Sequence, residues 1–143
     1  MTPWIRTVLL SLAMGTASTM GWARADQAAP AQGAAAKPSP RNVVPAEFDA
    51  LRKGTNTIVL DVRTASEYAD GHLPEALLLD FRAPDFEAQV AKLDRSRIYL
   101  VHCAGGGRSA RACVKMISLG FTNVVNLEGG LGAWTEEGRP LEK

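Results

Sequence analysis

Short apolar runs along the chain alternate with stretches in which apolar residues recur every three or four positions. The runs are rich in Val, Ile, Leu and Tyr and are typical of buried strands, at 43–44, 57–61, 76–79, 97–101 and 124–127. The stretches with helical spacing cover 45–52, 85–93, 110–119 and 131–136. Because strands alternate with helices, the pattern predicts an α/β domain of three layers, with a mostly parallel sheet flanked by helices.

Local signals indicate where several of these helices begin or end. Pro45 stands at a position suited to the first turn of a helix. Thr64, followed three residues later by Glu67, has the spacing of a capping box and predicts one more short helix after the strand 57–61. Gly120 follows the periodic stretch 110–119 and predicts its C-terminal end.

The N-terminal part of the chain does not fit this pattern. Residues 1–25 combine a positive charge at Arg6, an apolar stretch over 8–14 and a small-x-small site at 23–25, which predicts a secretory signal peptide and a periplasmic or secreted protein. The alternative is an uncleaved anchor, but polar residues and glycines shorten the apolar run below the roughly 20 residues of a membrane span. Residues 26–41 are rich in Ala and Pro and predict a flexible leader, so the folded domain is expected over 42–143.

Composition narrows the classes of partner. Of the 143 residues, 46% are apolar, which is enough for one core, and the formal net charge is +1. This balance lacks the basic excess that favours nucleic acid or an anionic membrane. Once the signal peptide is removed, we expect partners among small molecules or proteins.

The most informative stretch lies between the strand 97–101 and the helix 110–119. It places Cys103 before three glycines, Gly105 to Gly107, and Arg108. Amide N–H groups at a helix start and in a glycine-rich turn form an anion-binding nest, and an arginine adds a fork of donors for an oxyanion. Such surroundings lower the pKa of a thiol, so Cys103 is predicted to be a thiolate nucleophile.

This loop resembles the active-site loop of the rhodanese family, the thiosulfate sulfurtransferases, whose usual form is Cys-x-x-Gly-x-Arg-Ser. Cys103, Gly106, Arg108 and Ser109 stand at those positions. Two further blocks resemble the family's signatures in the same order, one over 61–74 and one over 127–140. The chain therefore resembles an exported rhodanese with a single module.

The resemblance implies a mechanism. Cys103 would attack the outer sulfur of thiosulfate, carry that sulfur as a persulfide and pass it to cyanide or a thiol. Arg108 would hold the sulfonate end of the donor, and backbone N–H groups would stabilise the anionic persulfide. The implied substrate-binding residues are Ala104, Gly105, Gly106, Gly107, Arg108 and Ser109. The resemblance implies no metal and no organic cofactor.

Two other functions use related chemistry. Phosphatases and arsenate reductases have similar loops, but such phosphatases place five residues between Cys and Arg, whereas 104–107 supplies four. The shorter loop favours a persulfide sulfur over a tetrahedral phosphoryl group. The third class is a carrier module that exchanges sulfur with a protein partner, and the intact Cys103 and Arg108 are compatible with it.

Several other residues are compatible with either a structural or a chemical role. Arg108 is either a substrate contact or a solvated surface charge, and Ser109 is either a contact or the N-cap of the following helix. The residues Asp61, Arg63, Glu67 and His72 are predicted to be mainly structural, with Arg63 and Glu67 spaced to pair with each other. His102 is expected to face the opposite side of the sheet from Cys103 and not to act as a base.

Two residues depart from the family pattern. Glu75 stands where the family commonly has Gly, which raises a question about the geometry of that turn. Cys113 stands where Ala is common, and it is either a small buried side chain or a disulfide partner for Cys103 in an oxidising compartment. Such a disulfide needs Cα atoms within about 7 Å of each other.

Overall fold

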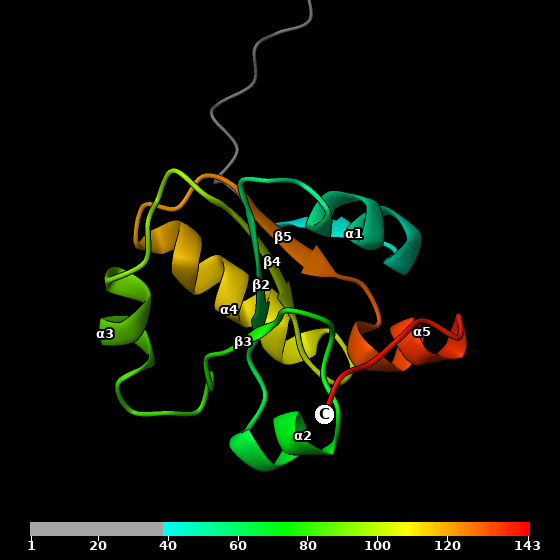
Figure 1. The fold of residues 1–143 in the computed structure, drawn as a ribbon. Coiled ribbons are helices and arrows are strands. Elements are labelled where there is room, and N and C mark those ends of the chain that lie inside the picture. Colours follow the sequence, from blue (N-terminus) through cyan, green and yellow to red (C-terminus); the bar gives the residue numbers. More distant parts are fainter. Residues whose placement is uncertain (1–38) are drawn as a thin grey trace, which may run out of the picture. The chain divides into compact units, whose positions relative to one another are not determined.

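The computed structural model describes residues 39–143. Five strands and five helices follow one another in this part of the chain (Figure 1): β1 Arg41–Val43, α1 Pro45–Arg52, β2 Thr57–Asp61, α2 Ala65–Asp70, β3 Leu77–Leu78, α3 Phe86–Ala91, β4 Ile98–His102, α4 Gly107–Ser118, β5 Val124–Leu127 and α5 Gly130–Glu136. The predicted signal peptide, 1–25, and most of the predicted leader lie outside the described residues. None of the helices in 39–143 has the length and apolar character needed to cross a membrane.

The strands form one five-stranded sheet in the order β1-β5-β4-β2-β3, and all the strand pairs in it are parallel. In Figure 1, α3 and α4 cover one face of this sheet, and α1 and α5 cover the other. The three-layer α/β fold predicted from the alternating pattern is therefore confirmed. A parallel sheet places the ends of β2 and β4 at one edge, where Asp61 is in register with His102.

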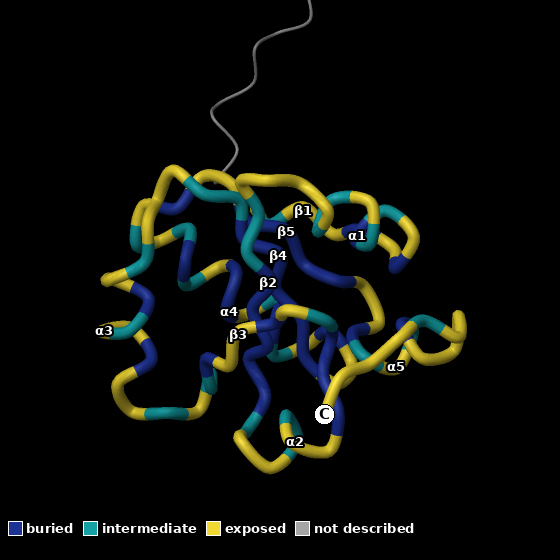
Figure 2. Tube along the Cα trace, in the orientation of Figure 1, coloured by how far each residue is buried: buried dark blue, intermediate teal, exposed yellow. Residues whose placement is uncertain are grey.

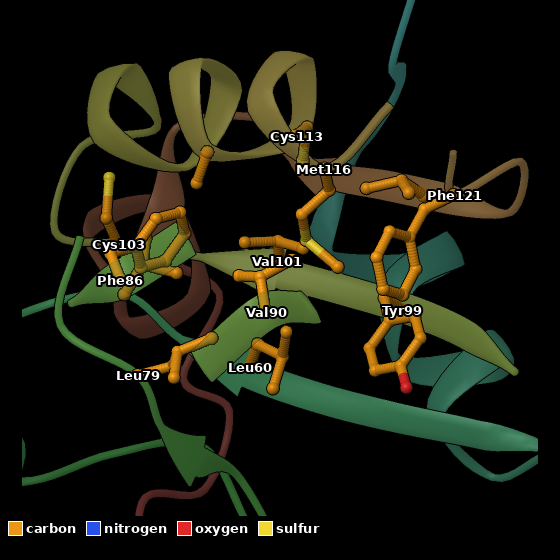
Figure 3. Packing of buried hydrophobic residues seen from close by; sticks show 13 residues of the cluster. Leu60, Leu79, Phe86, Val90, Tyr99, Val101, Cys103, Cys113, Met116 and Phe121 are labelled. Carbon is orange, nitrogen blue, oxygen red and sulfur yellow. The ribbon is translucent and has the colours of Figure 1, made fainter. Parts of the chain in front are cut away.

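Each face of the sheet has its own apolar core, and β4 contributes to both. Tyr99 and Val101 belong to the cluster beneath α3 and α4, together with Phe86, Cys113 and Met116 (Figure 3). Leu100 belongs to the cluster on the α1 and α5 face, which contains Phe48 and Trp134. Figure 2 shows this strand buried along its length. Side chains alternate between the faces because the side-chain period of a strand is two.

Several boundaries differ from those expected. β3 has two residues, and Leu77 and Leu78 are exposed by 54% and 37%, whereas a buried strand was predicted over 76–79. This strand pairs on one side only, so the apolar run lies along the edge of the sheet. α4 begins at Gly107, three residues before the predicted start, and β1 spans Arg41–Val43 rather than the predicted 43–44. Glycine's poor helix propensity hid the first turn of α4.

The turn before β3 contains a residue in an unusual conformation. Glu75 has φ 62, the left-handed region that glycine adopts without cost, and its side chain is exposed. Its backbone N–H donates to Glu142 Oε2 at 3.2 Å. The C-terminal residues are held beside this turn, because His72 and Glu142 exchange two backbone hydrogen bonds of 2.8 Å. The turn therefore has the geometry that glycine favours although Glu75 occupies it.

We predict that Glu75→Gly stabilises the protein by roughly 0.5–1 kcal/mol, because the strain of a left-handed side chain exceeds the added entropy of glycine in the unfolded chain. The midpoint of thermal unfolding should rise by a few degrees. Glu75→Ala is the matched control, since alanine loses the carboxylate but keeps the strain. Equal midpoints for the glycine variant and the wild type would contradict the prediction.

Candidate active site

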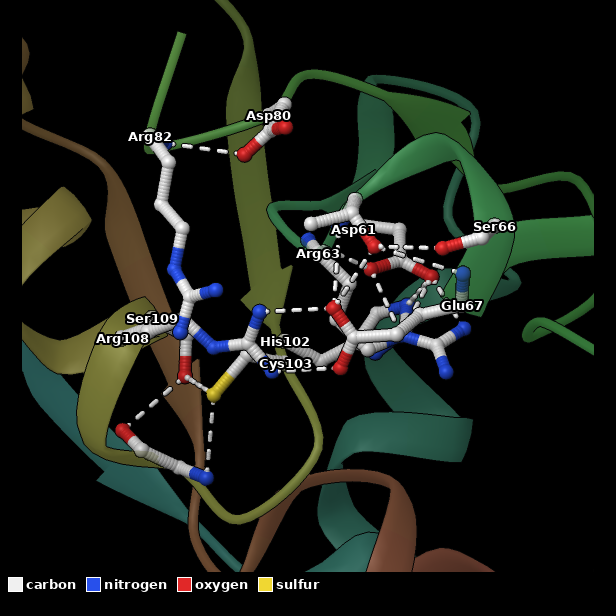
Figure 4. A network of polar contacts seen from close by, with 12 residues as sticks. Asp61, Arg63, Ser66, Glu67, Asp80, Arg82, His102, Cys103, Arg108 and Ser109 are labelled. Carbon is white, nitrogen blue, oxygen red and sulfur yellow. Dashed lines mark hydrogen bonds and ion pairs between the residues drawn. The ribbon is translucent and has the colours of Figure 1, made fainter.

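Cys103 lies directly after β4, in the loop that leads into α4 (Figure 4). It belongs to the same core cluster as Val101, while Leu100 belongs to the opposite one, so Cys103 is on the α4 face of the sheet. The residue is 1% exposed, whereas its neighbours Ala104 and Gly105 are exposed. The sulfur is therefore shielded by the protein at the edge of the sheet where parallel α/β folds bind ligands.

Two donors are directed at the Cys103 sulfur. The Gly106 N–H lies 3.1 Å from Sγ, and the Ser109 hydroxyl lies 3.4 Å from it. The same hydroxyl is 3.0 Å from the Gly106 carbonyl oxygen, so its single hydrogen is shared between two acceptors. The helix N-cap is Gly106, and Ser109 lies in the first turn of α4. Ser109 thus contacts the sulfur and is not the N-cap.

These contacts favour the charged form of the thiol. Burial acts to raise the pKa of Cys103, since it disfavours a buried charge. The Ser109 hydroxyl and the nearby backbone N–H groups of Ser109, Gly105 and Gly106 together outweigh burial, and the pKa lies below its usual value. The direction agrees with the prediction of a thiolate at the start of a helix.

The three glycines of the loop do not have equal roles. Gly106 has φ 89, and a Cβ there would lie 3.2 Å from the backbone nitrogen of Gly129. Gly105 and Gly107 have neither a positive φ nor any heavy atom within 4 Å of such a Cβ. A run of three glycines suggests that the backbone turns at each of them, but Gly105 and Gly107 have conformations open to other residues. Only Gly106 needs to be glycine, because the loop turns there and approaches another backbone.

Arg108 forms a two-pronged ion pair with Glu67 of α2. Nη1 donates to Oε2 at 2.8 Å and Nη2 donates to Oε1 at 2.6 Å. Glu67 also completes the capping box, since its Oε2 accepts from the Thr64 backbone N–H at 3.1 Å and from the Thr64 hydroxyl at 3.0 Å. Hydrogen bonds from Arg108 hold the pKa of Glu67 well below its usual value. Arg108 is therefore neither a solvated surface charge nor an unpaired cation.

The predicted pair between Arg63 and Glu67 is wrong. Arg63 instead pairs with Asp61 at the end of β2, with Nη2 2.6 Å from Oδ2, and donates to the Gly71 carbonyl at 2.7 Å. Both side chains are buried, so the pair joins the end of β2 to the residue after α2. The long side chain of Arg63 reaches back to Asp61, two residues earlier in the chain. The spacing of the residues along the sequence did not indicate this ion pair.

His102 is fully buried beside this pair. Its Nε2 lies 3.7 Å from Asp61 Oδ2, and neither ring nitrogen has a hydrogen-bond partner within residues 39–143. Burial lowers the pKa of His102 to about 4, so the ring is neutral at pH 7. Because side chains alternate between the two faces of the sheet along β4, His102 faces the side opposite Cys103, as predicted.

The rear of the loop is held by α5, a contact that the sequence analysis did not identify. Leu131 N–H donates to the Cys103 carbonyl at 2.8 Å, and Gly132 N–H donates to the Ala104 carbonyl at 3.0 Å. A Cβ at Gly130 would lie 2.5 Å from the Cys103 carbonyl oxygen, which no side chain tolerates. The Gly129-Gly130 pair in the family-like block was the available signal, because glycine permits close backbone approach.

Cys113 lies in α4, away from the loop. Both cysteines are free thiols, and Figure 3 shows them at different places along the α4 face. Burial raises the pKa of Cys113 to about 12, so this thiol is protonated at neutral pH. The structure agrees with a small buried side chain at this position. Within the described residues, no group of three His, Cys, Asp or Glu side chains is placed to hold a metal ion.

Comparison with known proteins agrees with this geometry. Residues 44–137 match the model of the rhodanese-like domain, which is more than half of the chain. The chain therefore belongs to the rhodanese-like family, and the resemblance stated from its motifs is confirmed.

Two curated relatives share part of the chain. A protein of Allochromatium vinosum named sulfurtransferase is 31% identical over 86 residues, covering 60% of this chain and 78% of that protein. The Arabidopsis thaliana protein HIGH ARSENIC CONTENT 1, mitochondrial, is 39% identical over 89 residues, covering 55% of this chain. The aligned region spans about half of the Arabidopsis protein, 53% of its length. The family of this chain thus includes sulfurtransferases at modest identity.

A solved structure has the same architecture. The crystal structure of a rhodanese-related protein from Thermoplasma volcanium superposes with a TM-score of 0.63 at 32% identity. It covers 71% of this chain and 97% of that one. The parallel sheet flanked by helices is therefore shared with an experimentally determined member of the family.

We predict that Ser109→Ala raises the pKa of the Cys103 thiol, because the thiolate loses a hydroxyl donor while remaining buried. The pH dependence of the iodoacetamide alkylation rate measures this pKa. Ser118→Ala is the matched control, since Ser118 is exposed in the same helix and donates only to the Lys115 carbonyl. An unchanged midpoint in Ser109→Ala would show that the hydroxyl does not act on the sulfur.

A second prediction concerns acid stability. The pKa of Glu67 is lower in the folded protein than its usual 4.5, so the ionised carboxylate stabilises the fold above about pH 4.5, and this stabilisation is lost as the pH falls further. In Glu67→Gln the free energy of unfolding should decrease less between about pH 5 and pH 3 than in the wild type. Urea unfolding at each pH measures it.

Glu87→Gln serves as the control for this experiment. Glu87 pairs with Lys115 at 2.7 Å, but both side chains are largely exposed, and such pairs contribute little because solvent screens them. Its pH profile should follow that of the wild type. Parallel profiles for Glu67→Gln and the wild type would rule out the proposed contribution of the Glu67 pair.

Proposed function

We propose that this protein is a sulfurtransferase that moves a sulfane sulfur from thiosulfate to cyanide or a thiol through a persulfide on Cys103. The observation that carries the proposal is the shielded sulfur that accepts hydrogen bonds from Gly106 and Ser109. Donors directed at the sulfur itself stabilise a charge on that atom. Membership of a family that contains sulfurtransferases supports the same reaction class.

In the first half-reaction the Cys103 thiolate attacks the outer sulfur of thiosulfate. A new S–S bond forms to Cys103 while the S–S bond of thiosulfate breaks, and sulfite leaves with the electron pair. In the second half-reaction cyanide or a thiolate attacks the outer sulfur of the persulfide. The Cys103–S bond breaks, and its electron pair regenerates the thiolate. Neither step needs an external oxidant or reductant.

Arg108 would orient the donor anion more than it would attract it through an unpaired positive charge. Glu67 engages one hydrogen on each of Nη1 and Nη2, so three of the five guanidinium N–H groups stay available to a donor anion. The ion pair holds the planar fork in one position beside the loop. Loop amides from Ala104 to Ser109 would bind the negative end of the donor and the persulfide.

Arsenate or phosphate chemistry is the second candidate, because one relative carries an arsenic-related name. Two features favour sulfur transfer over it. The loop supplies four residues between Cys103 and Arg108, and the Gly106 N–H is already occupied by the thiol sulfur. A tetrahedral oxyanion needs those donors around its own oxygens. A sulfur-carrier module for a protein partner would use the same persulfide.

We also propose that the protein is exported. Residues 1–25 have the three-part pattern of a signal peptide, and cleavage after Ala25 would leave the described domain behind a short leader. A periplasmic or secreted location follows from this proposal.

The purified protein is expected to convert thiosulfate and cyanide to thiocyanate and sulfite with ping-pong kinetics, and Cys103→Ala should reduce this turnover to background. Cys113→Ala is the control and should retain activity, because Cys113 is buried and protonated. After reaction with thiosulfate alone, mass spectrometry should find one added sulfur on Cys103.

Parallel assays with a phosphate monoester and with arsenate separate the alternatives. Undiminished thiocyanate formation by Cys103→Ala would contradict the proposed sulfur transfer through Cys103. Turnover of the phosphate monoester or arsenate without any sulfur transfer would favour the second candidate.

A further inference from the structure

The positive charges near the Cys103 loop differ in whether they are neutralised. Arg108 is paired with Glu67, and Lys115 of α4 is paired with Glu87 of α3. Each of these pairs brings an opposite charge within 2.7 Å, so neither cation offers a net charge to an approaching anion. Any long-range attraction for an anion must come from other side chains.

Arg82 is the first of these. It lies in the segment between β3 and α3, which is fixed to the sheet edge by a hydrogen bond of 3.2 Å from the Phe81 N–H to the Val62 carbonyl. The backbone N–H of Arg82, and not its side chain, donates to Asp80 Oδ1 at 2.8 Å. Figure 4 shows the Arg82 side chain extending toward the loop that carries Cys103 and Ser109.

Arg111 is the second. It lies in α4 three residues after Arg108, so the two project from neighbouring positions on the same side of the helix. Its guanidinium carbon lies 5.6 Å from the centroid of the Phe81 ring. Phe81 also lines a hollow of about 430 Å³ between α3 and α4, next to Pro84 and Phe86. Arg111 therefore packs against the ring of the residue that immediately precedes Arg82 in the chain.

Both guanidinium groups are exposed, and within 39–143 neither has a carboxylate at ion-pair distance. The protein supplies no counter-charge for Arg82 and Arg111 in this part of the chain, so an anion that approaches the loop would provide one. The field of the two arginines also raises the local concentration of anions near the sulfur.

We propose that Arg82 and Arg111 recognise the anionic end of the sulfur donor as it approaches Cys103, and that they select donors that carry their negative charge on a group apart from the reacting sulfur, such as a sulfonate or a carboxylate. The proposal rests on the sulfur-transfer function for its substrate. In this arrangement Arg108 orients the donor, and the Arg82–Arg111 pair supplies the attraction.

The test uses the full-length chain and two reagents that differ in charge. Iodoacetate and iodoacetamide both alkylate a thiolate, but only iodoacetate is an anion. The ratio of their rate constants at Cys103, measured by peptide mass spectrometry, should fall about threefold to fivefold in Arg82→Gln and in Arg111→Gln, and further in the double variant. High salt should reduce the wild-type ratio toward that of the double variant.

Arg97→Gln is the control: it removes one half-exposed arginine that lies just before β4, at the opposite end of that strand from Cys103, and 3.9 Å from Asp94. Its ratio should equal that of the wild type. A ratio unchanged in the double variant, or lowered equally by Arg97→Gln, would overturn the proposal. So would a Cys103 that reacts with neither reagent, because no anion could then reach it.

Steady-state kinetics separate this proposal from the proposed function. The KM for thiosulfate should rise in both variants while kcat stays close to the wild-type value, which a purely structural defect would not produce. If the wild type shows no sulfur transfer but the alkylation ratios still fall, the proposed function fails and anion recognition stands. If sulfur transfer is normal and the ratios do not move, only the role of Arg82 and Arg111 fails.

Discussion

A negative charge on a sulfur atom that solvent scarcely reaches is the constraint on which this structure depends. Burial alone raises the pKa of a thiol, so hydrogen-bond donors must converge on Cys103 for the thiolate to persist. Those donors come from the loop and from the first turn of α4, which begins at Gly107. The start of this helix is therefore part of the candidate active site as well as part of the fold.

The loop keeps this geometry because it is held on two sides by elements distant in sequence. On one side, Glu67 fixes Arg108 and at the same time caps its own short helix. On the other side, N–H groups of α5 bind the carbonyls of Cys103 and Ala104, which points the loop's own N–H groups the other way. Pre-organised donors need not rearrange when charge develops, and this is the largest advantage that such a site has over water.

Pairing decides how each arginine near the sulfur acts. Arg108 is locked to a carboxylate, which suits it for precise orientation, whereas Arg82 and Arg111 keep their charge and suit attraction from a distance. A site built this way separates the steering of an anion from its alignment. The same division would serve a small donor such as thiosulfate or a sulfur-bearing group on a protein partner.

The sequence by itself determined the alternation of strands and helices, the capping box at Thr64 and Glu67, and the position of Cys103 between a strand and a helix. These features are local, since they depend on side-chain period, on turn chemistry and on residues within one loop. The departure at Glu75 was also visible, and the left-handed conformation there explains why glycine is common at that position in the family.

Only the tertiary structure decided which charged side chains form ion pairs. Arg63 pairs with Asp61, and Glu67 pairs with Arg108, which is 41 residues away in the sequence. Gly130 of α5 lies close to the Cys103 carbonyl. The apolar run 76–79 was predicted to be a buried strand, but Leu77 and Leu78 are exposed at the edge of the sheet, because strand order and not the run itself sets their burial. Pattern along a chain specifies elements, whereas ion pairs and burial depend on distances between elements, which exist only once the sheet has formed.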